Sequence, residues 1–230
     1  MKEFLINSSY FGVLVSLLGY WIGTKLKARF RLALLNPLLV SAALTIAALL
    51  VLKIDYQSYN AGAKYLSYLL TPTTVCLAIP LYEQRALLMK NFRAIFAGIF
   101  SGALTSVACV YLMSLAFGLD HAQYVTLLPK SVTTAIGMPV AQELGGYGNI
   151  AAAVIILTGV LGNIVAEGFF RLLRIREPIA RGVALGTSSH AIGTARAMEM
   201  GDTEGAMSSL SIAVSGLVTV VLVSVFAQFM

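Results

Sequence analysis

Long apolar runs, separated by short clusters of charge, constrain this chain more than any other feature of its sequence. A helix needs about 20 mostly apolar residues to cross a bilayer. Four uncharged runs meet that length: 4–23, 32–52, 94–118 and 205–229. A fifth run, 148–170, meets it despite containing Asn163 and Glu167. Because lipid offers no hydrogen bonds to the backbone, the sequence predicts that these five runs are membrane-crossing helices.

The composition supports this interpretation. Hydrophobic residues make up 58% of the 230 residues and charged residues only 11%, whereas about a quarter of the residues in a soluble domain are charged. The first run is too long for the apolar core of a signal peptide and lacks an A-x-A cleavage pattern, so we expect it to remain as a span. The predicted fold is an all-α integral membrane protein with seven to eight transmembrane helices in one domain, 1–230.

The excess of positive charge, +6 overall, lies in short clusters between the apolar runs. Such clusters mark loops on the cytoplasmic side of a membrane, and we prefer this interpretation to a patch that binds nucleic acid. The three clusters are Lys25, Lys27, Arg29 and Arg31; Arg85, Lys90 and Arg93; and Arg171, Arg174, Arg176 and Arg181.

Three further segments, 62–84, 119–146 and 182–201, mix apolar residues with Pro, Gly and hydroxyl side chains. Helices broken in this way are tolerated at membrane depth only where the freed backbone faces protein or a water-filled cavity. Two of the segments are also related in sequence. Residues 133–137 align with 189–193 as a small polar pair followed by Ala-Ile-Gly. We therefore predict interrupted or re-entrant helices in a transporter-like core built from an inverted repeat.

The basic clusters also predict a topology, provided that all three lie inside. Segment 119–146 then enters and leaves the membrane at the outer face, and segment 182–201 crosses outward. Asp202 and Glu204 fall outside, and the C-terminus falls inside. A plain arrangement of eight spans remains the alternative.

Hydroxyl side chains gather where the second half of each broken helix begins. The N–H groups freed at such a point carry partial positive charge and suit an anion. The alternative is that the hydroxyls only cap the helices or allow close packing. The candidates for substrate binding are Thr133, Thr134, Ser188, Ser189 and Thr194.

Three ionisable residues within these segments complete the candidate site. An ionisable side chain at membrane depth is a functional hypothesis by default. Lys130 and Arg196 are each able to hold a carboxylate. The alternative for Lys130 is that its long side chain reaches the membrane surface. The alternative for Arg196 is an ion pair with Glu199, three residues later on the same helix. His190 titrates near neutral pH and is the candidate for proton coupling; a structural bond to a freed carbonyl is the alternative.

The sequence offers little support for catalysis or for metal binding. Cys76 and Cys109 stand alone without C-x-x-C spacing, and no H-E-x-x-H, G-x-S-x-G or P-loop motif is present. We expect no enzymatic activity, no metal site and no cofactor.

At these motifs the chain resembles the LrgB/CidB family of bacterial membrane proteins, including its YohK-like branch. The resemblance covers nearly the whole chain. It rests on LLNPLLV (34–40), PLYEQ (80–84), LPKSVTTAI (128–136), ARGVALGTSSHAIGTARA (180–197) and EGAMSSL (204–210). YohK-like members often have TTPIA where this chain has Thr134-Ala135-Ile136-Gly137, so the break here is expected to be softer. The resemblance implies a multi-pass protein of the bacterial cytoplasmic (inner) membrane.

The resemblance implies two functions. Members were named holin-like or antiholin-like proteins that modulate murein hydrolase export and cell lysis, usually beside a small LrgA/CidA-type membrane partner. A plastid relative resembles a glycolate/glycerate translocator, and some bacterial pairs resemble pyruvate transport systems.

We expect a transporter of small monocarboxylates, 2-hydroxy or 2-oxo acids such as glycolate or pyruvate. The alternative is a holin/antiholin-like protein that controls lysis through assembly. The expected partners are the lipid bilayer, a small carboxylate anion, an LrgA/CidA-type protein and further copies of the chain, with no nucleic acid.

Overall fold

The computed structural model describes residues 10–30, 35–69, 72, 75–76 and 78–230. The described part of the chain contains helices and no strand. Its contacts divide it into two compact units, Met1–Cys76 and Leu77–Met230, and each unit is described by itself.

Unit 1 consists of α2 (Phe11–Phe30), α3 (Pro37–Leu52) and α4 (Tyr56–Ser67). Asn36 begins α3 by accepting the N–H of Leu38 at 2.8 Å, and Pro37 occupies the first helical position, where a missing N–H costs nothing. Helices α2 and α3 pack closely: a Cβ built at Gly23 would lie 2.8 Å from the Pro37 carbonyl oxygen.

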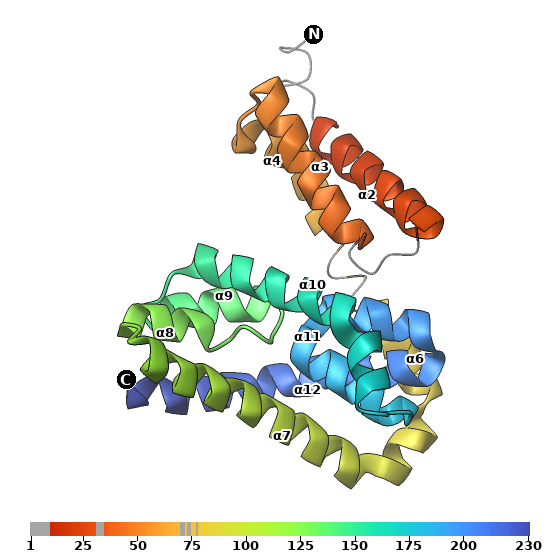
Figure 1. Ribbon diagram of the computed structural model, residues 1–230, viewed down its shortest axis with the longest axis vertical. Helices are drawn as coiled ribbons and strands as arrows, with labels where there is room; N and C mark the ends of the chain where they lie inside the picture. Colours follow the sequence, from red (N-terminus) through yellow and green to blue (C-terminus); the bar gives the residue numbers. More distant parts are fainter. Residues whose placement is uncertain (1–9, 31–34, 70–71, 73–74, 77) are drawn as a thin grey trace. The chain divides into compact units, whose positions relative to one another are not determined.

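Three long helices frame unit 2: α7 (Arg85–Phe117), α10 (Gly148–Leu172) and α12 (Asp202–Phe226), the last extended by the short helix η1 (Ala227–Phe229). Helix α10 runs opposite to α7 and α12 (Figure 1). Within the described residues, these three helices are long and apolar enough to cross a membrane. A short helix, α6 (Ala78–Glu83), packs against α12.

Helices α8 (His121–Leu127) and α9 (Thr134–Glu143) form a hairpin between α7 and α10. Asp120 caps α8 in a capping box with Gln123. The N–H of Tyr147, beyond the end of α9, donates to Thr126 Oγ1 of α8 at 2.7 Å, so the chain returns alongside itself. We call residues 121–143 hairpin 1. Its two ends lie at the same end of unit 2, as the re-entrant topology predicted (Figure 1).

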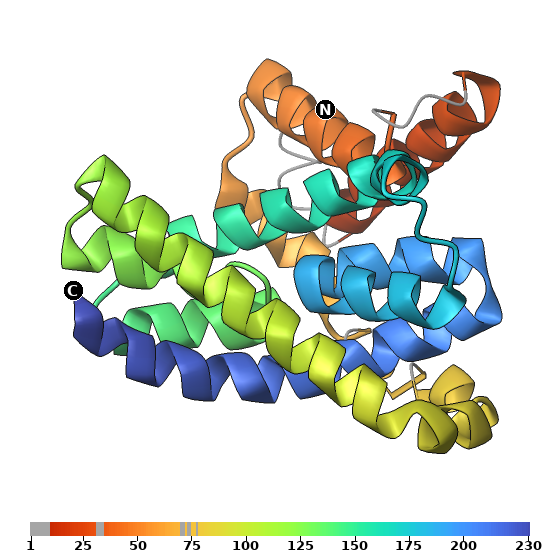
Figure 2. The same cartoon turned by 60° about the horizontal axis from the view of Figure 1, so that its bottom comes forward.

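Helix α11 (Pro178–Met200) is a second hairpin, because its chain reverses at His190. His190 has φ 42° and ψ −136°, a conformation rare for any residue with a side chain. A Cβ built at Gly193 would lie 2.6 Å from the Leu185 carbonyl oxygen, whereas residues eight apart in a straight helix lie about 12 Å apart. Figure 2 shows the two halves of α11 side by side. We call residues 178–200 hairpin 2.

This reversal corrects the predicted topology. Segment 182–201 does not cross outward, because the left-handed backbone at His190 returns it to the end from which it came. Arg181 Nη1 and Glu204 Oε1 consequently lie 4.0 Å apart, so the acidic start of α12 lies at the basic end of unit 2 and not at the opposite end.

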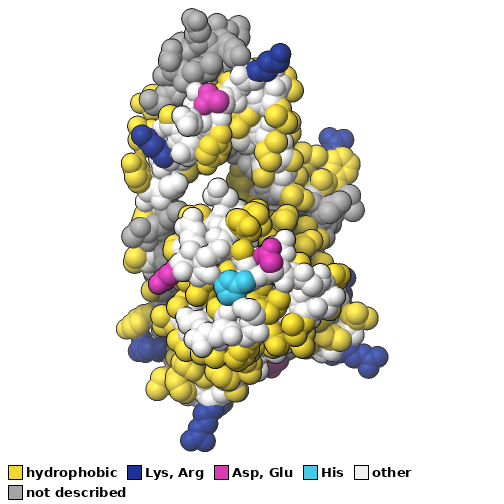
Figure 3. All heavy atoms as spheres, turned by 90° about the vertical axis from the view of Figure 1, so that its left-hand side faces the viewer, with side chains coloured by type: hydrophobic (Ala, Val, Ile, Leu, Met, Phe, Trp, Pro, Cys, Tyr) yellow, Lys and Arg dark blue, Asp and Glu magenta, His cyan; other side chains and the backbone are white. Residues whose placement is uncertain are grey.

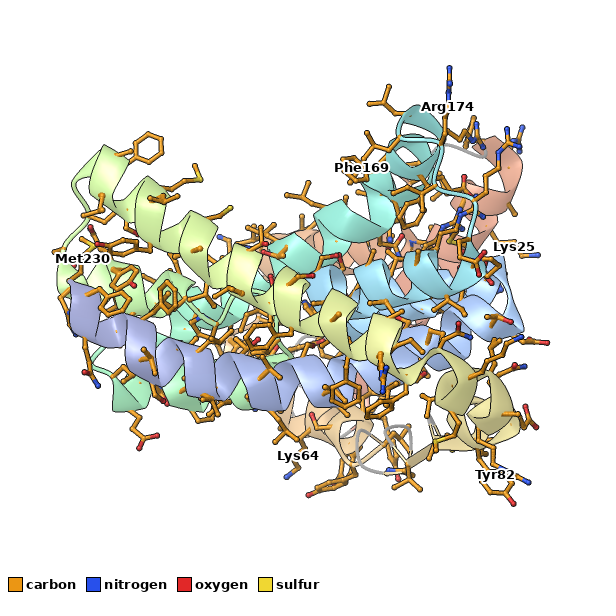
Figure 4. The ribbon with its side chains drawn as sticks, turned by 90° about the horizontal axis from the view of Figure 1, so that it is seen from below. Lys25, Lys64, Tyr82, Phe169, Arg174 and Met230 are labelled. Carbon is orange, nitrogen blue, oxygen red and sulfur yellow. The ribbon has the colours of Figure 1, made fainter. Side chains whose placement is uncertain are left out.

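The predicted side of the C-terminus is also wrong relative to the two basic clusters of unit 2, at 85–93 and 171–181. The Met230 carbonyl accepts a hydrogen bond from His121 Nδ1 at 2.6 Å, beside the start of hairpin 1. In Figure 4, Met230 and Arg174 lie at opposite ends of unit 2. Figure 3 faces the end with the C-terminus, where a histidine lies among acidic side chains.

Several predicted boundaries also change. The clusters at 24–31 and 85–93 were expected to be loops, but α2 continues to Phe30 and α7 begins at Arg85. Lys and Arg are good helix formers, so a basic cluster need not end a helix. Residues 4–9, 32–34 and five residues between 70 and 77 lie outside the described residues, and with them parts of three predicted segments. The count of seven to eight spans therefore stays a prediction.

In unit 2, large apolar side chains lie on the surface and small polar side chains lie in the interior, as expected for a protein in lipid. Leu112, Leu161 and Leu217, one from each long helix, expose more than half of their surface. Ser208, Ser211, Ser215 and Thr219 form a buried polar stripe along α12. Small and hydroxyl side chains let membrane helices approach closely, which is how hairpin 2 packs on α12: a Cβ at Gly186 would lie 2.3 Å from the Ser208 carbonyl oxygen.

Candidate functional site

Small residues spaced four apart along α7 bring the tips of the two hairpins together. A Cβ at Gly98 would lie 3.3 Å from Val183 Cγ1, and a Cβ at Gly102 would lie 2.9 Å from Thr187 Cγ2, so the first half of hairpin 2 lies along α7. One turn further along α7, Ser106 Oγ is 3.0 Å from Ser131 Oγ in the loop of hairpin 1. The two tips therefore approach one another near Ser106.

A cleft of about 910 Å³ lies between α7, α10 and the first half of hairpin 2. Its volume is in the range of pockets that hold small molecules. One end of the cleft, which we call the tip end, is lined by Ser106, Lys130, Ser131, Ser188 and Ser189. The other end reaches Asn91, Ile175 and Glu177, beside the basic clusters. Figure 4 looks onto α7 and α10, with Phe169 of the α10 wall labelled.

Lys130 lies at the tip end, and its ammonium group has only hydroxyl partners among the described residues. Its Nζ donates to Ser131 Oγ at 3.0 Å and to Ser106 Oγ at 3.2 Å. None of the ion pairs formed by the described residues includes Lys130. The other charged residue that lines the cleft is Glu177, beside the basic clusters. A cation held in a pocket without a carboxylate partner favours binding of an anion.

The hydroxyls of Ser188 and Ser189, in the first half of hairpin 2, also line the tip end. Ser188 Oγ donates to the Ala184 carbonyl at 2.7 Å and lies 3.0 Å from Ser189 Oγ. Ser189 is buried against Gly162 of α10, where an added Cβ would lie 1.8 Å from Ser189 Oγ. Of the predicted substrate-binding residues, the structure thus brings Lys130, Ser188 and Ser189 to one cleft.

His190 and Thr194 lie outside the cleft lining and hold hairpin 2 in place. His190 is buried, and its Nε2 donates to the Ile155 carbonyl of α10 at 2.9 Å. Thr194 Oγ1 donates to the His190 carbonyl at 3.0 Å and lies 2.7 Å from Ser208 Oγ of α12. The bond is structural, but the Ile155 carbonyl belongs to the continuous helix α10 and is not the freed carbonyl of the alternative considered for His190. The role of His190 in proton coupling stays a prediction.

Arg196 pairs with carboxylates of the protein itself. Its guanidinium contacts Glu199 on the same half of hairpin 2 and Glu167 on α10, and Glu167 is also 3.6 Å from Arg171. Arg196 does not line the cleft. The structure therefore places it in an ion-pair network that ties hairpin 2 to α10.

Thr133 and Thr134 lie at the start of α9, where the sequence placed them, but they do not line the cleft either. The Thr133 carbonyl accepts the N–H groups of Ile136 and Gly137 at 3.0 and 2.8 Å. Of the two hairpins, only the loop before α9 and the first half of hairpin 2 contribute to the lining of the cleft. The expectation that the freed N–H groups of the second half-helices face the site is thus not met in this cleft.

The sequence interpretation missed the contribution of α7. Ser106 bonds Lys130, and Thr105 and Ser101 line the same wall. A signal was present in the sequence: Gly98, Gly102 and Ser106 recur every four residues and mark one face of a helix. That face predicts close packing, and its partner became visible only in the fold.

Comparison with known proteins adds the family. The model of the LrgB-like family matches residues 16–229, which include every cleft residue named above. This chain belongs to the LrgB family. It is 40% identical to the antiholin-like proteins LrgB of Bacillus mycoides (strain KBAB4) and Bacillus subtilis (strain 168), over 96% of this chain and 96% of each relative. The antiholin-like protein LrgB of Bacillus cereus (strain B4264) is equally similar over the same share. No solved structure matches this LrgB-family chain.

Proposed function

We propose that this LrgB-family protein acts in the membrane as an antiholin-like protein. The support is the identity of 40% over 96% of both chains to relatives that carry that name. The three long apolar helices of unit 2 fit a protein that acts within a bilayer. The proposed role, suggested by the family, is to modulate murein hydrolase activity and cell lysis, with an LrgA/CidA-type protein as partner.

Complementation in Bacillus subtilis tests this role. The chain is produced in a strain that lacks its own antiholin-like protein LrgB, and lysis is followed as the fall in turbidity after a mild detergent. We expect the lysis rate to return to that of the parent strain. If the chain is present in the membrane fraction and lysis is unchanged, with or without a co-produced LrgA/CidA-type partner, the proposal is wrong.

We propose transport of small monocarboxylates as a second function, because one specific observation favours it. Lys130 is a cation at the tip end of the cleft, where both hairpins contribute lining residues, and it bonds only hydroxyl groups among the described residues. A carboxylate at this position would accept hydrogen bonds from Nζ and neutralise its charge. Charge-assisted bonds of this type are the stronger ones in proteins.

The fold of unit 2 supports the same proposal. Helix α7 leads into hairpin 1 at one end of the unit, and α10 leads into hairpin 2 at the other (Figure 1). Helix-and-hairpin pairs that run in opposite directions are the arrangement of inverted-repeat transporters, in which the solute lies where broken helices meet. The cleft reaches from the hairpin tips to the basic end, and we propose that this end is cytoplasmic because positively charged loops usually are.

Substitution of Lys130 tests the transport proposal. Binding of radiolabelled glycolate and pyruvate is measured on purified full chain in detergent, and uptake is measured in liposomes with and without an LrgA/CidA-type partner, across a pH gradient. Hydrogen bonds to charged groups contribute about 1.5–3 kcal/mol, so we expect Lys130→Met to weaken binding by about 10- to 100-fold. Lys64→Met, which removes an ammonium group in unit 1, is the matched control and is expected to bind as the wild type does.

The two functions are separable by the same variant. Absence of binding and uptake by the wild-type chain under all these conditions would end the transport proposal. If Lys130→Met loses binding but still restores lysis control, the antiholin-like role does not depend on the cleft. If both are lost while the variant remains folded, one site serves both.

A further inference from the structure

Thr187 carries a buried hydroxyl without a hydrogen-bond partner. The residue exposes 5% of its surface, and its Oγ1 has no partner among the described residues. It lies in the first half of hairpin 2, three residues before the break at His190, and it lines the cleft. Burying a hydroxyl without a partner is unfavourable, so such a group calls for an explanation.

The surrounding hydroxyls show how unusual this is. A Ser or Thr in a helix commonly donates to the carbonyl four residues earlier. Ser188, Ser209 and Ser211 do so, with distances of 2.7, 2.8 and 2.7 Å. Thr187 does not, although it lies in the same helical context. Its hydroxyl therefore stays available to another partner, where a valine of the same shape would avoid the cost.

The position of Thr187 relative to Lys130 indicates which partner. Thr187 packs on Gly102 of α7, and the Lys130 ammonium bonds Ser106, one turn further along the same helix. Four residues of helix span about 6 Å. A carboxylate bound at Lys130 would thus present the substituent on its neighbouring carbon toward Thr187, since two hydrogen bonds of about 2.8 Å with a small acid between them cover a span of that order.

We propose that Thr187 is a specificity residue of the cleft, whose hydroxyl bonds an oxygen on the carbon next to the carboxylate of a solute held by Lys130. The methyl carbon Cγ2 of Thr187 makes the contact with Gly102 of α7, and rotation about the Cα–Cβ bond brings the buried hydroxyl into the cleft. The inference rests on the proposed transport function and deepens it: the lysine holds the charge, and the threonine distinguishes acids with an oxygen at that carbon from acids without one.

The test compares glycolate with acetate, which differ by one hydroxyl at that carbon. The affinity of each acid is measured on the purified full chain, by competition against radiolabelled glycolate. For the wild type we expect glycolate to bind about tenfold more tightly than acetate. Thr187→Val, which keeps the shape and removes the hydroxyl, is expected to abolish that ratio by weakening glycolate alone. Thr187→Ser is expected to keep it.

Thr45→Val is the matched control, because Thr45 in α3 of unit 1 is also buried and its Oγ1 also lacks a partner among the described residues. It is expected to leave both affinities unchanged. If Thr187→Val weakens both acids equally, or neither, Thr187 is not a specificity residue, while binding that depends on Lys130 would still uphold the transport proposal. If the wild type binds neither acid, the inference about Thr187 is overturned, and the transport proposal then depends on the binding and uptake of pyruvate.

Discussion

Because α11 reverses at His190, we predict that a Gly→Ala substitution has opposite effects on stability at Gly193 and at Gly168. A Cβ at Gly193 would lie 2.6 Å from the Leu185 carbonyl oxygen and 2.6 Å from Ser189 Cβ, both on the other half of hairpin 2. Ordinary contact begins at 3.4 Å, so the two halves would have to separate by several tenths of an ångström. The matched control is Gly168 of α10, where an added Cβ would meet nothing within 4 Å.

The magnitude follows from two opposing effects. Overpacking a tight contact costs about 1–3 kcal/mol, whereas replacing Gly by Ala within a helix stabilises it by about 1 kcal/mol. The cost at Gly193 should be near the upper limit, because the tip is held to α10 by two bonds. His190 Nε2 donates to the Ile155 carbonyl at 2.9 Å, and Asn163 Nδ2 donates to the Ile192 carbonyl at 3.0 Å. We therefore expect Gly193→Ala to lower the unfolding free energy by about 2 kcal/mol and Gly168→Ala to raise it by up to about 1 kcal/mol.

Thermal unfolding of the purified chain in detergent measures the difference. For a chain of this length, 1 kcal/mol corresponds to a change in Tm of about 2–4 °C, so Gly193→Ala should melt roughly 4–8 °C lower than the wild type. In a continuous helix without a reversal, Gly193 would behave like Gly168. A Tm for Gly193→Ala equal to or above that of the wild type would therefore refute the folded-back hairpin.

Two further predictions concern topology and the ion-pair network. The topology is tested in a variant in which both native cysteines are replaced by serine. In this variant Asp120→Cys should react with a membrane-impermeant maleimide in intact cells, and Asp202→Cys should react only after permeabilisation. Labelling of both cysteines from the same side would contradict the two-hairpin arrangement. Arg196→Gln should lower the unfolding free energy by about 1 kcal/mol, as for a partly exposed ion-pair network, and should leave glycolate affinity unchanged. A loss of affinity from Arg196→Gln that Glu167→Gln does not share would instead assign Arg196 to the solute.

Local patterns in the sequence were sufficient to predict the broken helices and the relation between them. The alignment of 133–137 with 189–193 uses an offset of 56 residues, and the same offset carries α9, Thr134–Glu143, onto 190–199, the return half of hairpin 2. Small polar residues, an Ala-Ile-Gly step and a closing Glu recur because both half-helices begin at a tip and end at the surface. Such features are local, so the sequence reveals them directly.

The positive-inside pattern predicted hairpin 1 but not hairpin 2. If the clusters at 85–93 and 171–181 lie on the same side of the membrane, the chain between them crosses an even number of times. Helices α7 and α10 supply two crossings, and a re-entrant segment 119–146 adds none. No basic cluster follows hairpin 2, and the acidic pair Asp202 and Glu204 carries little topological information, because Asp and Glu contribute little to orientation. The direction of the chain after His190 was therefore not encoded in the charge pattern.

The membrane character of this protein follows from the sequence alone, because the length and the low charge of an apolar run are properties of that segment and do not depend on tertiary contacts. The site needed the tertiary structure. Whether Arg196 meets a solute or Glu167, and whether Lys130 meets Ser106, depends on contacts between residues 24 or more positions apart. The Arg196 contact follows from the reversal of the chain at His190, and the Lys130 contact follows from the packing of the hairpin 1 loop against α7 at Ser106. The sequence determined which residues were able to bind an anion, and the packing of the hairpins decided which of them line the cleft.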